Sequence, residues 1–493
     1  MLRERFSTGT LLATGKPWRV RRFRLLLWGM ALLLTSAGCA VKSPPSREEL
    51  RQQALAGIEL PAEWRAGGWP GPVADNWLAS FEDDRLAILV AEAVTRSPDL
   101  RISAVKVEQA AEYVNLAKAT LLPALNILGT GGTKSGGGDA TSALQGIAAV
   151  ASWELDLWGR LRYGRNGAQE SYVSTMADFE FACQSIAAST AKGWFTATET
   201  LLQQQIAEEM VRSAELLLAL TEKRYEVGVT GQEDVALAQA SLGTLRDSAA
   251  QVDLAHEQAI RALELLIGRY PTAELKVRRQ LTKLPGPLPV GIPLELIERR
   301  PDLIAAERRV AAAFNRIGEA KAARLPKITL NASVAAFTSE AIQLKDDWKN
   351  PVSGAGARLL APVYQGGALQ TQVEIRTLEQ KEAVAEYAAK ALRALGDVEN
   401  VLAAIENLAR RQRLLQRNVV DQQRAFELVQ TGYRTGTVDM RGVQQQLLDL
   451  HAARLNLLRV QSEQLSQRVN LHLALGGSFG ADFGNRRQQA LNQ

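Results

Sequence analysis

The chain contains the same pattern twice, and this internal repeat limits the folds that it can adopt. Three groups of residues recur, the first two 203 residues later and the third 208 residues later: Ser97-Pro98-Asp99-Leu100 as Arg300-Pro301-Asp302-Leu303, Leu122-Pro123 as Leu325-Pro326, and Tyr225 with Gly228 as Tyr433 with Gly436. Repeats of solenoid proteins are much shorter, about 20–50 residues. The pattern therefore indicates a duplicated half, and each half is expected to hold a similar set of elements.

The positions of the 17 prolines point to very long helices. No proline lies between Pro123 and Pro271, and none follows Pro362. Because proline breaks helix interiors, each of these tracts is predicted to form a helical hairpin with glycines in its turn. The predicted helices are 160–226 with 233–268 and 368–434 with 440–475, and the turn glycines are Gly228, Gly231, Gly436 and Gly442.

Each half is predicted to begin with a helix, at about 85–121 and 301–324, which the Leu-Pro pair ends. Alternating apolar and polar residues then predict strands. The alternation is clear from Ile328 to Ala336 and from Trp153 to Leu157, and it is weaker from Ala355 to Val363. Polar loops are expected at 131–141 and 338–350.

Charge gives no sign of a nucleic-acid partner. The chain has a formal net charge of +5, but residues 1–38 hold seven basic residues and one glutamate. The remaining residues have a net charge of −1, so the basic character belongs to the N-terminal segment.

The N-terminal segment has the regions of a secretory signal peptide in their usual order. Arginines precede an apolar run from Leu25 to Leu34, which is too short to cross a bilayer. Ser36-Ala37-Gly38 and Cys39 follow and resemble a bacterial lipobox, although Ser36 stands where Leu is usual. We predict a signal peptide at 1–38 and lipidation of Cys39, the alternative being an ordinary signal peptide with a chance cysteine.

Four strands per chain cannot close a barrel, and open sheet edges are not tolerated in lipid. Three chains would supply twelve strands, whose polar faces suit a water-filled lumen. The alternative is a soluble sheet attached to a plain coiled coil.

Taken together, these features resemble the outer membrane factors, the TolC-like channels, and most closely their OprM-like lipoprotein branch that serves RND efflux pumps. The motifs that carry the likeness are Trp77-Leu-Ala-Ser-Phe81 with Asp83 or Asp84, Trp153-Glu-Leu-Asp-Leu-Trp-Gly-Arg-Leu-Arg162, Pro293-Leu-Glu-Leu-Ile-Glu-Arg-Arg-Pro-Asp-Leu303, Tyr433-Arg-Thr-Gly436 and Leu473-Ala-Leu-Gly-Gly477.

The resemblance implies a mixed α/β membrane protein with an internal two-fold duplication. A trimeric 12-stranded transmembrane β-barrel, four strands per chain, would continue into a long α-helical periplasmic barrel. The implied layout is a signal peptide at 1–38, a lipid-anchored equatorial segment at 39–84, a first repeat at 85–270, an equatorial linker at 271–300, a second repeat at 301–475 and a tail at 476–493.

The resemblance further implies a non-enzymatic protein of the outer membrane without a cofactor. It would be the passive exit duct of a tripartite pump, bound to a periplasmic adaptor and an inner-membrane RND transporter. A type I secretion channel and a periplasmic coiled-coil adaptor lipoprotein are the alternatives.

The resemblance also suggests a periplasmic gate. Tyr433, and Tyr225 in the other half, match an aromatic position that helps to hold the periplasmic end closed; packing at a helix end is the alternative for both. The family tends to have an acidic residue a dozen positions later, where this chain has Gln445. Arg441 lies one turn before it, and Asp439 is a nearby carboxylate that would compensate its charge.

Cysteine and histidine are too few to indicate a metal site. Cys183 is predicted to be a buried core residue. His256, His451 and His472 lie in helical tracts without ligand-like spacing, so structural or solvated positions are expected for them.

Overall fold

The computed structural model describes residues 41–69, 71–73, 75–130, 145–338 and 352–480. The signal peptide and Cys39 lie outside the described residues, as do the polar loops except for Thr338. The described chain divides into two compact units. The strand unit lies within residues 41–44, 117–166 and 315–376, and the helix unit within 45–116, 167–314 and 377–480.

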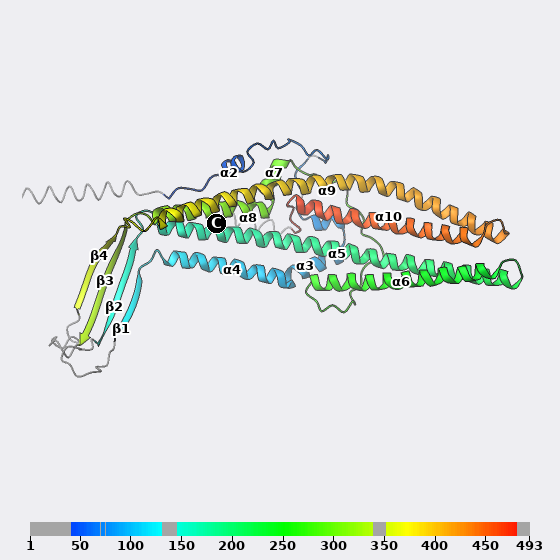
Figure 1. Cartoon of the computed structure of the whole chain (residues 1–493), viewed down its shortest axis with the longest axis horizontal. Helices are drawn as coiled ribbons and strands as arrows, with labels where there is room; N and C mark the ends of the chain where they lie inside the picture. Colours follow the sequence, from blue (N-terminus) through cyan, green and yellow to red (C-terminus); the bar gives the residue numbers. More distant parts are fainter. Residues whose placement is uncertain (1–40, 70, 74, 131–144, 339–351, 481–493) are drawn as a thin grey trace, which may run out of the picture. The chain divides into compact units, whose positions relative to one another are not determined.

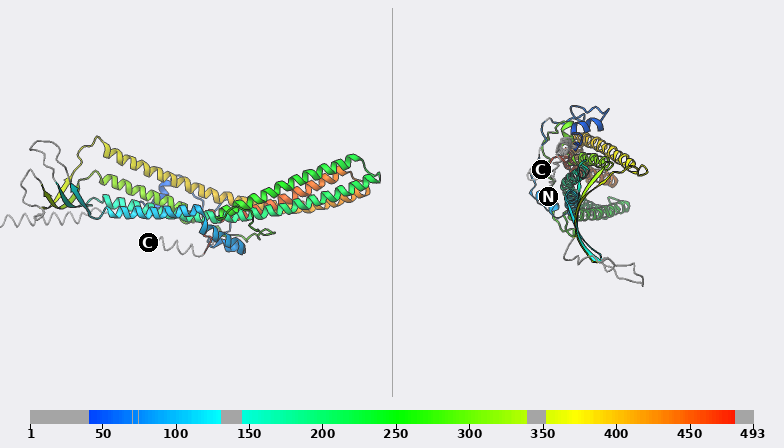
Figure 2. Two further views of the ribbon diagram at one scale, coloured as in Figure 1. Left: turned by 90° about the horizontal axis from the view of Figure 1, so that it is seen from below. Right: turned by 90° about the vertical axis from the view of Figure 1, so that its left-hand side faces the viewer.

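The strand unit contains one antiparallel sheet of four strands in the order β1-β2-β3-β4 (Figure 1). The strands are β1 (Ala124–Thr130), β2 (Gln145–Leu155), β3 (Lys327–Thr338) and β4 (Val352–Leu360). Each half of the repeat supplies one hairpin, and the sheet curves strongly in the end view (Figure 2, right). The strand predictions are confirmed except at two ends, because Leu157 and Val363 lie beyond β2 and β4.

The strand register aligns many of the apolar side chains of the four strands on one face, since alternate residues point to the same side. Leu125 and Ile127 of β1, Trp153 of β2, Leu330 of β3 and Leu359 of β4 share this face. The other face holds the polar residues Asn126, Ser152, Glu154, Thr329, Asn331, Ser333 and Arg358, together with the apolar residues Leu128, Val150, Val352 and Leu360. The sheet therefore has one largely apolar face and one mixed face that carries most of the polar side chains, and the predicted alternation is confirmed for β3 and for the end of β2.

Two tryptophans near the end of β2 donate hydrogen bonds to residues that lie just before β1 and just before β3. The indole Nε1 of Trp153 donates to the carbonyl oxygen of Leu121 at 2.9 Å, and Nε1 of Trp158 donates to that of Pro326 at 2.7 Å. At the same end Glu154 accepts hydrogen bonds from Arg160 and forms an ion pair with Lys327 at 2.7 Å. This polar cluster marks the end of β2, where the chain enters α5.

The two helical hairpins are confirmed. Their helices are α5 (Arg160–Glu226), α6 (Gln232–Leu266), α9 (Ala368–Thr435) and α10 (Met440–Ala474). In the helix unit all four run side by side (Figure 2, left) and share an apolar core that includes Met210, Leu242, Phe426 and Leu447. Such long helices depend on this packing, because an isolated helix is marginal in water.

The prediction of one helix over 85–121 is wrong. The structure has α3 (Asp84–Arg96) and α4 (Pro98–Ala119), which are separated at Ser97. Pro98 disfavours the helical conformation of the residue before it, and Ser97 has a ψ of 124°. The corresponding break at Arg300 separates α7 (Pro293–Arg299) from α8 (Pro301–Ala322).

Segments from both ends of the chain pack on the helices of this unit. They include α2 (Arg47–Ala54) and the 3₁₀ helix η1 (Trp77–Phe81). The indole of Trp77 stacks on the ring of His472, and Phe81 packs against Phe195. The N–H of Trp77 donates to the carbonyl oxygen of Ser478 at 3.2 Å, so residues 401 positions apart are joined at one place.

Candidate functional site

The helix tips hold every predicted gate residue, and two turns define them. Residues 227–231 join α5 to α6, and residues 436–439 join α9 to α10. Gly228 and Gly436 have positive φ values of 76° and 81°, which glycine adopts without strain. The prediction that Gly442 marks a turn is wrong, because this residue lies inside the first turn of α10.

Tyr433 is buried at the tip and joins α9 to α5. Only 2% of its surface is exposed, and its hydroxyl lies 3.2 Å from Oγ1 of Thr221. The guanidinium carbon of Arg224 lies 4.5 Å from the centre of the Tyr433 ring. Arg224 also donates to the carbonyl oxygens of Tyr433 and Arg434. The contacts combine a cation–π interaction with hydrogen bonds to backbone groups near the helix end.

Tyr225 matches Tyr433 in sequence but not in surroundings. Its side chain is 47% exposed. The residues that correspond by the repeat to Thr221 and Arg224 are Val429 and Gly432, which offer neither a hydroxyl nor a cation. No local pattern in the sequence marks Thr221 and Arg224 as partners of Tyr433. The two halves nevertheless differ at these positions at an offset of 208, because Val429 and Gly432 replace a hydroxyl and a cation.

Asp439, Arg441 and Gln445 take different places at the start of α10. Asp439 is the N-cap, and its Oδ1 accepts a hydrogen bond from the N–H of Gly442 at 2.8 Å. Arg441 is exposed, and no ion pair joins it to Asp439 or Glu233 within the described chain. Gln445 is also exposed, and its Nε2 donates to Oδ1 of Asp449 at 3.0 Å. Arg441 and Gln445 are four residues apart, so they share one face of α10.

The remaining sequence predictions concern core residues. Cys183 is buried in the apolar cluster around Trp194 and Phe195. His256 contacts Oγ1 of Thr200 through Nδ1 at 3.0 Å, His451 is half-buried, and His472 is buried. These positions match the structural roles predicted for them.

A buried carboxylate organises the start of α3. Asp83 accepts hydrogen bonds from the N–H of Leu86, from Nε1 of Trp194 and from Oγ1 of Thr282, and it pairs with Arg278 at 3.2 Å. Burial by itself would raise the pKa of Asp83, but these hydrogen bonds and the cation together lower it below its usual value. Asp83 therefore remains charged and fastens residues 278–282 to α3 and α5.

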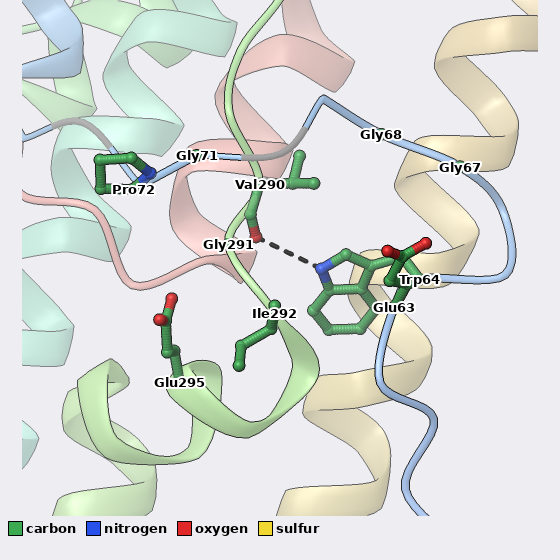
Figure 3. A pocket seen from close by; sticks show the side chains of 10 residues that line it. All are labelled: Glu63, Trp64, Gly67, Gly68, Gly71, Pro72, Val290, Gly291, Ile292 and Glu295. Carbon is green, nitrogen blue, oxygen red and sulfur yellow. Dashed lines mark hydrogen bonds between the residues drawn. The ribbon is translucent and has the colours of Figure 1, made fainter.

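A pocket of about 400 Å³ lies between residues 63–72 and 290–295 (Figure 3). Glu63 and Glu295 lie on two sides of it, and Trp64 donates through Nε1 to the carbonyl oxygen of Val290 at 3.3 Å. A Cβ at Gly68 would lie 2.5 Å from Cγ2 of Val290, so glycine permits this close approach. Within the described part of the chain, no predicted gate residue lines the pocket.

Of the helices in the described residues, none combines the length and the apolar character needed to cross a lipid bilayer.

Comparison with known proteins places these features in one family. The family described as outer membrane efflux protein matches residues 89–269 and 292–477, which are the two halves of the repeat. The pyoverdine export outer membrane protein OpmQ of Pseudomonas aeruginosa is 30% identical over 443 residues, covering 87% of this chain and 93% of that protein. The cation efflux system protein CusC of Escherichia coli K12 is 27% identical over 454 residues, covering 86% and 97%.

Solved structures of two outer membrane proteins have a fold similar to that of this chain. A crystal structure of CusC has a TM-score of 0.74 and 25% identity, and it covers 85% of this chain and 99% of that chain. The Campylobacter jejuni CmeC outer membrane channel has a TM-score of 0.81 at 18% identity, with 91% and 98% covered, and shows the shared fold. The chain belongs to the outer membrane efflux protein family, and it is a non-enzymatic channel of the outer membrane that extends into the periplasm as the exit component of an efflux system.

Proposed function

We propose that the chain works as a homotrimer and forms the passive exit duct of a tripartite pump. The observation that carries this proposal is the open sheet. In the described chain β1 and β4 each have a single neighbouring strand, so each leaves one edge unpaired, while the sheet presents an apolar face. Unpaired edges are not tolerated in lipid. Three copies would pair β4 of one chain with β1 of the next and close a barrel of twelve strands.

The duct has no energy source of its own, so it requires partners. We infer a periplasmic adaptor and an inner-membrane RND transporter, with the helix tips as the end that meets them. The relatives named above serve the export of pyoverdine and of cations, and a further relative is the toluene efflux pump outer membrane protein TtgC of Pseudomonas putida. Because these cargoes differ chemically, the proposal concerns the duct and its partners rather than one cargo.

Around this duct we infer the layout that the sequence predicts. The signal peptide is 1–38, and Cys39 is lipidated. Residues 39–84, 271–300 and 476–493 form an equatorial belt around the repeats at 85–270 and 301–475. Contacts within the helix unit support the belt, because Asp75 pairs with Arg299 at 2.9 Å and accepts a hydrogen bond from the N–H of Ser478 at 3.1 Å.

The gate is proposed at the helix tips. Tyr433, with Thr221 and Arg224, holds α9 against α5, and Asp439 caps the first turn of α10. Arg441 and Gln445 then form rings of three around the pore axis. Tyr225 is exposed and takes part at the surface of the tip rather than in this contact.

The first test is the mass of the protein in detergent together with conductance in planar bilayers. We expect a trimer that conducts ions. A conducting monomer would refute the twelve-stranded barrel. An adaptor lipoprotein would be non-conducting. Co-purification after cross-linking in cells separates an RND efflux duct from a type I secretion channel, since each is expected to retain its own class of inner-membrane transporter.

A further inference from the structure

Two rows of exposed residues with opposite charge run along α5 and α9 towards the helix tips. The acidic row consists of Glu208, Glu215 and Glu222 on α5, and the basic row consists of Arg410, Arg417 and Arg424 on α9. All six side chains are exposed in the single chain.

Both rows face away from the core of their own chain. On α5, Leu217 is buried, and at about 100° per residue it lies about 180° around the helix from Glu208. On α9, Leu408 is buried, and it lies about 160° around the helix from Arg410. The rows are therefore available to a neighbouring molecule.

The residues of the two rows also lie at matching distances from the helix tips. α5 and α9 run in the same direction to the tips, where Thr221 meets Tyr433. Glu208 and Glu215 lie 20 and 13 residues before Gly228, and Arg417 and Arg424 lie 19 and 12 residues before Gly436. At a rise of about 1.5 Å per residue, the members of each pair differ in height by about one residue. Both rows have the seven-residue spacing that keeps a contact in line along two packed helices.

The surroundings of the rows favour burial against protein. Leu216 beside the acidic row is 74% exposed, and Leu414, Val420 and Leu428 on the face of the basic row are 60%, 67% and 65% exposed. No ion pair joins the basic row to a carboxylate within the described residues. The acidic row has only exposed partners: Glu215 pairs with Arg246 at 2.8 Å, and Glu208 with Arg212 at 3.8 Å. Such exposed pairs are weak and exchange readily.

We propose that the partner of these rows is a second copy of this chain. In the assembled channel the basic row of one protomer lies beside the acidic row of the next, and the resulting ladder of ion pairs fixes the height at which neighbouring helix tips meet. This inference rests on the trimer of the proposed function. Two different complementary faces on one chain produce head-to-tail contacts, which close into a ring when the rotation permits.

Cysteine cross-linking in membranes tests the ladder. Glu215→Cys combined with Arg424→Cys should give covalent dimers and trimers with a short bismaleimide. The matched control is Glu215→Cys with Arg410→Cys, because Arg410 lies 26 residues before Gly436 and is therefore offset by about 20 Å. The control should give no cross-linked oligomers. Cross-links confined to one chain, or equal yields from both pairs, would overturn the ladder.

Charge reversal provides a second measurement on the same pairs. Arg417→Glu with Arg424→Glu should cause loss of the detergent-stable trimer, and adding Glu208→Arg with Glu215→Arg should restore it. Failure of this restoration counts against the ladder. If the unmodified protein is a conducting trimer while the cysteine pair remains uncross-linked, the ladder is wrong and the proposed function stands. A monomeric, non-conducting parent protein would overturn both.

Discussion

The hydroxyl oxygen of Tyr433 lies 3.2 Å from Oγ1 of Thr221, and the corresponding contact in the other half of the repeat cannot form. Thr221 donates its own hydrogen to the carbonyl oxygen of Leu217 at 2.8 Å, so the Tyr433 hydroxyl is the donor in the pair. The duplicated halves thus differ at the tips, because Val429 occupies the place of Thr221 beside Tyr225. The Tyr433–Thr221 hydrogen bond and the contacts of Arg224 with Tyr433 therefore have no counterpart at Tyr225.

Removing this hydrogen bond should loosen the tip. Tyr433→Phe leaves the ring and its contact with Arg224 but removes the donor, which costs about 1 kcal/mol for a typical hydrogen bond. We expect more frequent or longer openings in single-channel recordings, with the trimer intact. Tyr225→Phe is the matched control, because the Tyr225 side chain is 47% exposed and Val429 occupies the place that corresponds to Thr221. Equal effects of the two substitutions would show that the Thr221 contact does not hold the tip.

Acid should destabilise the helix unit through His472. The ring of His472 stacks on Trp77 with centroids 5.6 Å apart. Burial, and secondarily the positive charge of Arg468, lower the pKa of His472 to about 3. The ordinary value is about 6.5, so between these two values the unfolded chain binds a proton that the folded chain does not. Stability should therefore fall as the pH decreases from about 6.5 to about 3, by at most about 1.4 kcal/mol per pH unit.

The measurement is the thermal midpoint Tm of the detergent-solubilised trimer from about pH 8 to about pH 4, across the titration range of histidine. His472→Phe keeps an aromatic ring beside Trp77 and removes the titrating group, so the acid slope should become shallower. A slope that is the same in the variant and the parent would exclude His472 as its source. Burial also lowers the pKa values of His256 and His451, so part of the slope should remain.

The sequence predicts the long helices and the strands of this fold better than it predicts the helix break at Ser97 or the contact of Tyr433. The limits of α5, α6, α9 and α10 follow from proline-free tracts with turn glycines, and the two-faced sheet follows from alternation near Ile328 and Trp153. The break at Ser97 was missed although Pro98 signals it, because the apolar pattern continues through the break. The Tyr433 contact depends on Thr221, 212 residues away, and local pattern does not show which residues a tertiary contact joins.

The sheet should be more sensitive to proline in a central strand than in a polar connection. Ala332 in β3 is paired with both Ala151 and Ala355. Ala332→Pro removes a donor from the ladder and should reduce the yield of heat-stable trimer in membranes. Lys345→Pro changes a residue of the predicted polar loop 338–350 and should leave the yield nearly unchanged. If Lys345→Pro reduced the yield as much as Ala332→Pro, the ladder of β3 would not explain the loss.

Lipidation at Cys39 can be tested separately from assembly. Mass spectrometry of the mature N-terminus should find acyl groups in the parent protein and none in Cys39→Ser. The variant should still assemble and conduct, because a single lipid chain anchors a protein only marginally compared with a membrane-spanning structure. An acyl-free N-terminus in the parent protein would contradict lipidation and leave the barrel untouched.

Arg441 should set the charge preference of the closed end. It is exposed on the same face of α10 as Gln445, and Asp439 is engaged in capping the helix at Gly442 rather than in neutralising Arg441. Three arginines around a narrow lumen would repel cations, because protein walls of low dielectric strengthen the field inside a pore. Arg441→Ala should shift the reversal potential in a salt gradient towards cation preference, and Arg441→Glu should shift it further. Assembly should persist in both variants, because buried apolar residues such as Val443 and Leu447 hold α10 in place. An unchanged reversal potential in both variants would mean that Arg441 points away from the pore and that the charge filter lies elsewhere.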